Sequence, residues 1–344
     1  MTTEPARSRA TLTDISSRAW EHPADRGALV ALRKLKGFDT LLKGLSGFVR
    51  ERRIRYAYLG GAIRVDDRQF SGMNRLLAEV GRVLDIDELP ELFVRNSPYT
   101  NAFCIGMDKP IIVVNSAMLD LLDEEEMRFV LAHELGHAMS GHAVYRTLLM
   151  WLGNLTGLWR AIPVGSVGLR MIEAALTEWS RKAELSADRA GLLATQDPAV
   201  AYRVHMKLAS GSGDLSELDQ TAFFAQGAEY LEAGDIRDSV IKLLLVEGRS
   251  HPYAVVRAAE LRRWVESGEY TAILGGDYPR RADDKDAQMS QAAKDAADSY
   301  SEAFRSSQDA LGKLVHELAG LAGSAKGWLD EQLRRTRGKD DDEV

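Results

Sequence analysis

The sequence predicts an α+β fold that is mostly helical and has one small antiparallel sheet. Long stretches carry apolar residues at intervals of three and four, which is typical of helices with one buried face. Three short segments rich in β-branched and aromatic residues, 91–95, 101–105 and 111–115, are typical of strands. A hydrophobic content of 45% and a charged content of 28% are those of a globular protein.

The composition excludes some classes of protein. With 344 residues, the chain can bury one large core or two modest ones. Its formal net charge of -7, without any basic run, argues against nucleic-acid binding. The single cysteine, Cys104, excludes an internal disulfide framework and fits a reducing compartment, so we expect a cytoplasmic protein. Because Cys104 lies in an apolar run, we expect a buried and unreactive thiol.

The chain is expected to divide into three parts. Residues 1–27 are predicted to be a loose tail, and residues 28–270 a single catalytic domain. Residues 271–344 are charged and rich in alanine, which predicts a helical or disordered appendage. The segment 148–176 is apolar but is interrupted by charged and proline residues, so no run of 18 apolar residues survives. It predicts two packed or interfacial helices, and peripheral contact with the inner face of a membrane is left open.

Within the domain, each element follows from a local pattern. Residues 28–53 favour helices broken near Gly37, residues 54–65 fit a strand or an extended linker, and residues 70–84 predict an amphipathic helix. The last two strand candidates are joined by residues 106–110, whose composition is that of a hairpin turn.

The sheet has a possible role in binding. An outer strand leaves backbone groups unpaired, and an extended peptide can bind there as one more strand. The alternative is an ordinary edge strand that binds nothing.

A metal-binding motif follows the sheet, in a helix predicted at about 124–142. His133 and His137 are four residues apart, so a helix carries both imidazoles on one face. Glu134 lies about 100° further around the helix, close enough to reach a water at the same point. This is the H-E-x-x-H arrangement of zinc hydrolases, with two ligands and a general base. Acidic residues at 123–126 suit the start of this helix.

A catalytic zinc site needs a third protein ligand. His142 is out of register with the extended motif that would supply a third histidine, so we expect it to be an ordinary polar residue. Glu184 is a better candidate, in a helix predicted at about 178–193. Asp188 shares its helix face, so one carboxylate can bind the metal while the other accepts a hydrogen bond from a ligating histidine. The alternative is that both are exposed charges.

Taken together, these residues resemble a known family. The segments 133–137 and 184–191, the triplet Asn101-Ala102-Phe103, and Ser250-His251-Pro252 followed by Arg257 look like the HtpX-like zinc metallopeptidases. That family is related to the CAAX prenyl proteases and the mitochondrial Oma-type proteases. The resemblance covers residues from about 90 to 260, and its motifs are specific in their order and joint presence.

The resemblance implies a zincin-like domain and a gluzincin site with one Zn²⁺ per chain. The implied ligands are His133, His137 and Glu184, with Asp188 as the partner of a ligating histidine. Glu134 would be the general base and His251 a donor to the oxyanion, with Arg257 nearby. Asn101, Ala102 and Phe103 would bind the substrate strand.

The predicted function is that of a zinc-dependent endopeptidase, in which Glu134 assists the attack of a zinc-bound water on a peptide bond. Its partner is then a polypeptide substrate. Two alternatives remain: a metal-containing scaffold that binds peptides without cutting them, and a membrane-surface interaction protein with little protease activity. The oligomeric state does not follow from the sequence.

Overall fold

The computed structural model describes residues 8–34, 51–159, 166–232, 253–286 and 288–302. The elements run in chain order as η1 (Ser17–Ala19), α1 (Pro23–Arg33), α3 (Glu51–Gly61), β1 (Ile63–Arg64), α4 (Ser71–Val83), β2 (Glu91–Arg95), β3 (Ala102–Ile105), β4 (Ile111–Asn115), α5 (Ser116–Leu121), α6 (Glu124–Met139), α7 (His142–Trp159), α8 (Ser166–Thr195), α9 (Pro198–Ser210), α10 (Gln220–Glu232), α12 (Ala254–Glu266), α13 (Glu269–Leu274) and η2 (Arg281–Asp286). A further helix covers residues 291–302.

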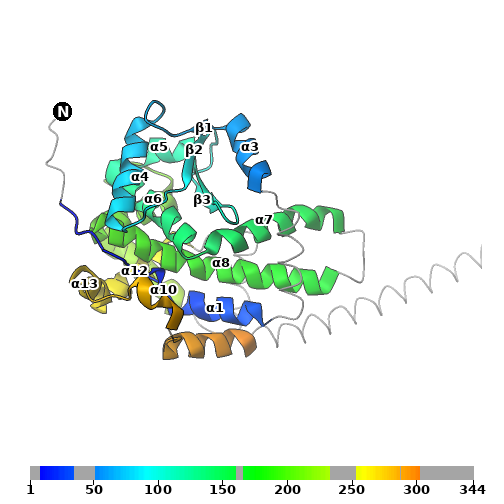
Figure 1. Cartoon of the computed structure of the whole chain (residues 1–344). Helices are drawn as coiled ribbons and strands as arrows, with labels where there is room; N and C mark the ends of the chain where they lie inside the picture. Colours follow the sequence, from blue (N-terminus) through cyan, green and yellow to red (C-terminus); the bar gives the residue numbers. More distant parts are fainter. Residues whose placement is uncertain (1–7, 35–50, 160–165, 233–252, 287, 303–344) are drawn as a thin grey trace, which may run out of the picture.

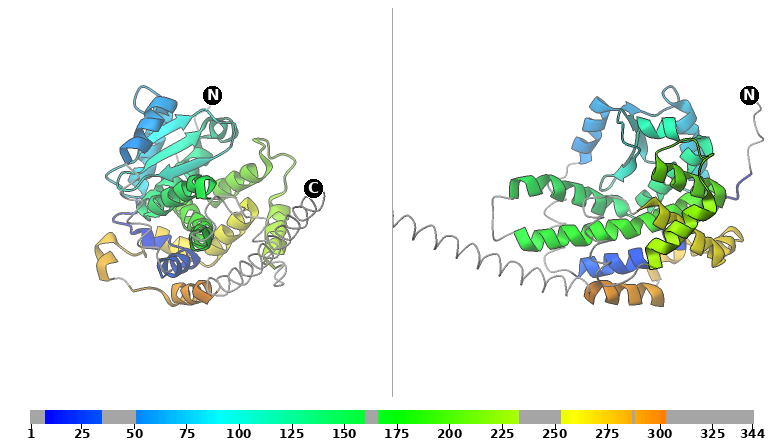
Figure 2. Two further views of the ribbon diagram at one scale, coloured as in Figure 1. Left: turned by 90° about the vertical axis from the view of Figure 1, so that its right-hand side faces the viewer. Right: turned by 180° about the vertical axis from the view of Figure 1, so that it is seen from behind.

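The elements are stacked in layers. The sheet, with α3, α4 and α5, forms the upper part of the molecule in Figure 1, and α6 lies directly beneath it. The long helix α8 packs against α6, and α1 packs against α8 on the side away from the sheet (Figures 1 and 2). The mostly helical α+β prediction is therefore confirmed.

The sheet is mixed, and the antiparallel prediction was wrong for one pair of strands. The strand order is β1-β2-β4-β3, with β3 antiparallel to β4 and β2 parallel to β4. The predicted hairpin of β3 and β4 is therefore present. After β2, however, the chain forms the outer strand β3 first, and β4 then lies between β2 and β3. All five residues of β4 are buried, as expected for a strand with a neighbour on each side and a covered sheet face above and below.

Each face of the sheet has its own core. Ala102 and Cys104 of β3 lie in the main core with α4, α6 and α9, whereas Phe103 and Ile105 face α3. The two cores follow from the alternation of side chains along a strand. Helix α3 covers most of the segment 54–65, for which the sequence left a strand or a linker open. Both alternatives were wrong for residues 54–61, whereas residues 63–64 form the short strand β1. Ile54 and Tyr58, four residues apart, pack one face of α3 onto the sheet.

The amino-terminal segment is part of the core, and the predicted loose tail was wrong for residues 8–27. Leu12, Ile15 and Trp20 are almost fully buried in the main core. The apolar residues are too sparse there to show a period, so the pattern gave no sign of this packing.

The predicted boundary at residue 270 also does not hold. Tyr270 and Ile273 of α13 belong to the main core. Beyond them, Ile15 forms an isolated antiparallel bridge with Arg280, and the Ser16 hydroxyl donates to Asp284 at 2.6 Å. The amino-terminal segment is therefore joined directly to residues 280–284.

Candidate metal centre

Helix α6 positions the two predicted histidine ligands. Its start is fixed by a capping box, in which Asp123 and Glu126 each accept a hydrogen bond from the other's backbone N–H. One turn separates His133 from His137, and their Nε2 atoms are 3.2 Å apart. Both imidazoles are buried.

Glu184 of α8 completes a cluster of three side chains. One carboxylate oxygen lies 3.3 Å from His133 Nε2, and the other lies 3.3 Å from His137 Nε2. The close approach of α6 and α8 depends on Gly136, where an added Cβ would lie 2.6 Å from the Cβ of Ala190. The structure thus brings together the three residues for which the sequence suggested a metal site.

The donor set fits zinc. Ligands held tetrahedrally at the usual zinc distances of about 2.0–2.1 Å are about 3.3 Å from one another. The two Nε2 atoms are 3.2 Å apart, and each lies 3.3 Å from one of the two oxygens of Glu184, which is close to this spacing. In addition, Oε2 of Glu134 is buried and has no hydrogen-bond partner among the described residues. Such an atom is costly unless a ligand or water uses it. These three residues could therefore hold one Zn²⁺.

Asp188 orients the first histidine. Its Oδ1 lies 3.0 Å from Nδ1 of His133, which leaves Nε2 of that ring to face the cluster. Arg257 donates to both oxygens of Asp188, at 2.7 and 2.5 Å, and its Nη1 lies 3.3 Å from Glu184. Burial raises the pKa of Asp188, but the charge and the hydrogen bonds of Arg257 outweigh this and keep the pKa well below its usual value.

The site's ionisable groups are shifted in different directions. Burial lowers the pKa of His133, but its hydrogen bonds to Asp188 and Glu184 prevail and raise the pKa to about 9. Burial and the charge of Arg146 hold the pKa of His137 well below its usual value. Burial raises the pKa of Glu134, opposed by the charges of His133 and Arg146. A carboxyl group with a raised pKa on the cluster's edge is suited to proton transfer.

Sequence reasoning missed the partner of His137. His142 was expected to be an ordinary polar residue, yet its Nδ1 lies 3.0 Å from Nδ1 of His137, and its Nε2 lies 3.1 Å from Oδ2 of Asp25. Gly141, with φ +69, makes the turn that brings His142 back over His137. The close spacing of the two histidines was a visible signal. Asp25 has none, because it lies more than 100 residues away in the sequence.

Arg146 and His205 were not singled out from the sequence. The Arg146 guanidinium of α7 lies 3.2 Å from Glu184, and His205 of α9 lies 3.6 Å from Asp188. Burial lowers the pKa of His205 to about 4. Both side chains sit on helices that pack around α8, so only the fold brings them to the site.

The predicted substrate strand is an edge strand in the described part of the chain. Ala102 and Phe103 lie in β3, and the carbonyl of Asn101 just before it accepts a hydrogen bond from the backbone of Asn115. Both α6 and α7 contact β3. Cys104 in this strand is buried, and burial raises the pKa of its thiol, as expected for an unreactive cysteine. His251 lies outside the described residues, as does the part of the predicted appendage beyond residue 302.

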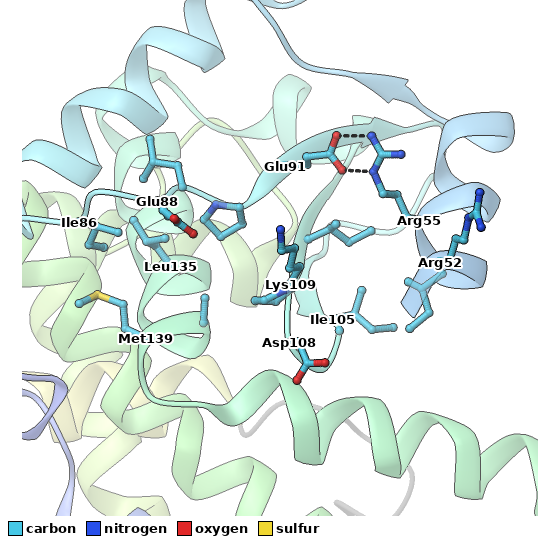
Figure 3. Close-up of a pocket in the computed structure, with 17 residues that line it drawn as sticks. Arg52, Arg55, Ile86, Glu88, Glu91, Ile105, Asp108, Lys109, Leu135 and Met139 are labelled. Atoms are coloured by element: carbon cyan, nitrogen blue, oxygen red, sulfur yellow. Dashed lines mark hydrogen bonds and ion pairs between the residues drawn. The ribbon is translucent and has the colours of Figure 1, made fainter. Parts of the chain in front are cut away.

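A cavity of about 930 Å³ lies beside α6 (Figure 3). Leu135, Ala138 and Met139 of α6 line it together with residues of α3 and of the β3–β4 turn. None of the residues of the metal cluster lines this cavity, so it is separate from the site.

In the described residues, no helix combines the length and the apolar character that crossing a membrane requires.

Comparisons with known proteins agree with the site. The model of peptidase family M48 matches residues 67–265. The plastoglobule-localized metallopeptidase 48, chloroplastic, of Arabidopsis thaliana is 36% identical over 273 residues, which cover 76% of each chain. An HtpX protease homolog of Bacillus velezensis is 29% identical over 171 residues, or 42% of this chain and 57% of that protein. The mitochondrial metalloendopeptidase OMA1 of Arabidopsis thaliana is 33% identical over 130 residues, or 36% of this chain and 27% of that protein. No solved structure matches.

Proposed function

The chain belongs to peptidase family M48 and is therefore a metalloprotease, and we propose that it is a zinc-dependent endopeptidase. The observation that carries the proposal is the buried cluster of His133, His137 and Glu184, with Glu134 on the same helix as the two histidines. Two imidazoles and one carboxylate leave a fourth position of a tetrahedral zinc site for water or substrate. Zinc bound there would polarise the scissile carbonyl and acidify a water molecule.

We assign the proton transfers to Glu134. Its carboxylate accepts a proton from the attacking water and then passes that proton to the leaving amine. The raised pKa of Glu134 makes its carboxylate a better acceptor of the proton from water, and the resulting carboxylic acid can still donate that proton to the amine. Asp188 holds His133 in the orientation that directs Nε2 toward the cluster, and Arg257 keeps Asp188 ionised.

The edge strand supports cleavage at internal bonds. A polypeptide that adds to β3 as one more strand is held through its backbone, without any need for a free terminus. Residues 101–103 would then bind substrate, and His251 would donate to the oxyanion as the family resemblance implies. Cleavage within a long unfolded chain follows from this mode of binding.

The change Glu134→Gln tests the proposal. It keeps the size of the side chain and removes the base, so we expect unchanged zinc content and a loss of turnover of about 10²–10⁴-fold. Zinc is measured by elemental analysis, and cleavage of casein by mass spectrometry of the fragments. Fragments with two new internal ends identify an endopeptidase.

The matched control is Glu124→Gln, which alters an exposed glutamate at the start of the same helix and should leave turnover unchanged. If Glu134→Gln cleaves as fast as the wild type, the assignment of the base is wrong. If the zinc-loaded wild type binds casein and leaves it intact, the chain is a peptide-binding scaffold instead.

A further inference from the structure

A continuous series of hydrogen-bonded side chains leads from His137 to the amino-terminal helix α1. Nδ1 of His137 lies 3.0 Å from Nδ1 of His142, and Nε2 of His142 lies 3.1 Å from Asp25. Asp25 also accepts hydrogen bonds from the Trp179 indole at 2.9 Å and from the Ser186 hydroxyl at 2.6 Å. All five side chains are buried.

The proton positions in this series can be worked out from His137 outward. Nε2 of His137 faces the cluster, so a metal there requires an unprotonated Nε2 and places the proton on Nδ1. This Nδ1–H then donates to Nδ1 of His142, which must be an acceptor. A neutral His142 therefore carries its own proton on Nε2 and donates it to Asp25.

Asp25 closes the series because an ionised carboxylate only accepts hydrogen bonds. Three donors point at it, from His142, Trp179 and Ser186. Reversing any proton in the series would set two donors or two acceptors against each other in a buried place, which is costly. This arrangement leaves Nε2 of His137 unprotonated toward Glu184, 3.3 Å away, and a metal bound between the two would satisfy both atoms.

We propose that His142 and Asp25 are positioning residues, which hold His137 in the tautomer and orientation that a metal needs. The two histidines of the cluster are then fixed in different ways: His133 directly by Asp188, and His137 through a second imidazole by Asp25. This inference rests on the proposed zinc site. It adds α1 to that site, since Asp25 precedes the residues matched by the family model.

A purely structural role for the series would have a different effect. Asp25 ties α1 to α8 through Trp179 and Ser186, so its loss could weaken the packing of two helices and nothing more. Trp179→Phe removes one of these ties but leaves the pair of His142 and Asp25 in place. It is therefore the matched control, expected to lower stability while zinc affinity stays within about twofold.

The test uses the full chain with His142→Phe, which keeps a ring but has no acceptor, and His142→Gln, whose amide can both accept and donate. Zinc affinity is measured by competition with a fluorescent chelator, and folding by circular dichroism. We expect His142→Phe to bind zinc about 10–100-fold more weakly and His142→Gln to recover much of that loss. Asp25→Asn should also weaken binding, since its amide brings a donor where three donors already meet.

The tautomer of His137 gives a readout that does not depend on zinc. Nitrogen chemical shifts of ¹⁵N-histidine in the zinc-free protein should show the Nδ1–H form in the wild type and in Trp179→Phe, and its loss in His142→Phe. If the wild type shows the Nε2–H form, or if His142→Phe binds zinc as tightly as the wild type, the inference is overturned. A wild type that shows the Nδ1–H form but binds no zinc contradicts the proposed function instead.

Discussion

At the scale of single residues, the site is a buried set of charges in which each group depends on its neighbours. Arg257 reaches both Asp188 and Glu184, so one guanidinium balances two buried carboxylates. His205 lies beside the same aspartate but stays neutral, because burial lowers its pKa to about 4. Of these two neighbours of Asp188, Arg257 therefore supplies the balancing positive charge and His205 does not.

His205 should make the fold sensitive to acid. The pKa of His205 is about 4 in the folded protein and about 6.5 in the unfolded chain. As the pH falls from 6.5 to 4, the imidazole therefore becomes protonated in the unfolded chain but not in the folded protein. Stability is lost over this window by about 3 kcal/mol at its lower end. Denaturant unfolding of the wild type and His205→Gln at pH 7 and pH 4 measures this. The variant should lose about 3 kcal/mol less between the two pH values, and an equal loss would contradict the assignment.

The residues of the site differ in how far the sequence could reveal them. His133, Glu134 and His137 lie within one turn and a half of helix, so the helical period alone places them together. Glu184 and Asp188 could be paired with each other but not with a particular partner. Asp25, Arg146 and His205 reach the site only through the packing of three other helices on α8, which no local pattern encodes.

At the scale of the elements, the geometry of the cluster depends on how closely α6 and α8 approach each other. Gly136 lies between the two ligating histidines and faces Ala190. Phe129, one turn before His133, likewise fills the space left by Gly191. Small residues on both helices therefore set the distance at which Glu184 meets the imidazoles.

Gly136→Ala should separate these helices. The added methyl group would overlap the Cβ of Ala190, and overpacking of this kind costs about 1–3 kcal/mol. We expect weaker zinc binding together with a lower thermal midpoint. Gly60→Ala is the control, since nothing lies within 4 Å of the added Cβ and alanine is the better helix former, so it should be neutral or stabilising. Equal effects of the two changes would show that the contact with Ala190 is not limiting.

The elements were predictable where one local signal dominated. The acidic cap and the apolar period identified α6, and the turn residues identified the β3–β4 hairpin. Helix α3 was mistaken because tyrosines and isoleucines favour strands in isolation, whereas here they cover one face of the sheet. The parallel pairing of β2 and β4 depends on the path of residues 96–101 between β2 and β3. This path is held by a hydrogen bond from the side-chain amide of Asn115 to the Tyr99 carbonyl, a contact between residues distant in the sequence.

At the scale of the whole molecule, residues 278–281 are hydrogen-bonded to the amino-terminal segment and to the residue that follows α4 and Leu84. Arg281 donates to the backbone carbonyl and the carboxylate of Asp85, and the Tyr278 hydroxyl donates to the carbonyl of Thr13. These contacts join the residues around α13 to the amino-terminal segment and to the end of α4. The appendage predicted from residue 271 onward therefore begins with residues 278–284, which are hydrogen-bonded to the domain and which we call the clamp.

Truncation shows where the domain ends. A chain ending at Leu274 loses the contacts of Arg281 and of Asp284, together with the buried Ala293 and Ala297 of the helix at 291–302. We expect the lost hydrogen bonds alone to cost about 2–3 kcal/mol and to lower the thermal midpoint by roughly 5–10 °C relative to a chain ending at residue 302. Differential scanning calorimetry measures both midpoints. If the shorter chain is as stable as the longer one, the clamp contributes nothing to folding.

Because Asp25 and Arg257 both contact the histidines or their partners, the order of synthesis matters for this protein. On a growing chain, Arg257 is synthesised 232 residues after Asp25. Until Arg257 is present, Asp188 lacks the guanidinium that donates to both of its oxygens. We therefore expect metal capture to wait until Arg257 has packed against Asp188, so that hydrolytic activity begins late in folding.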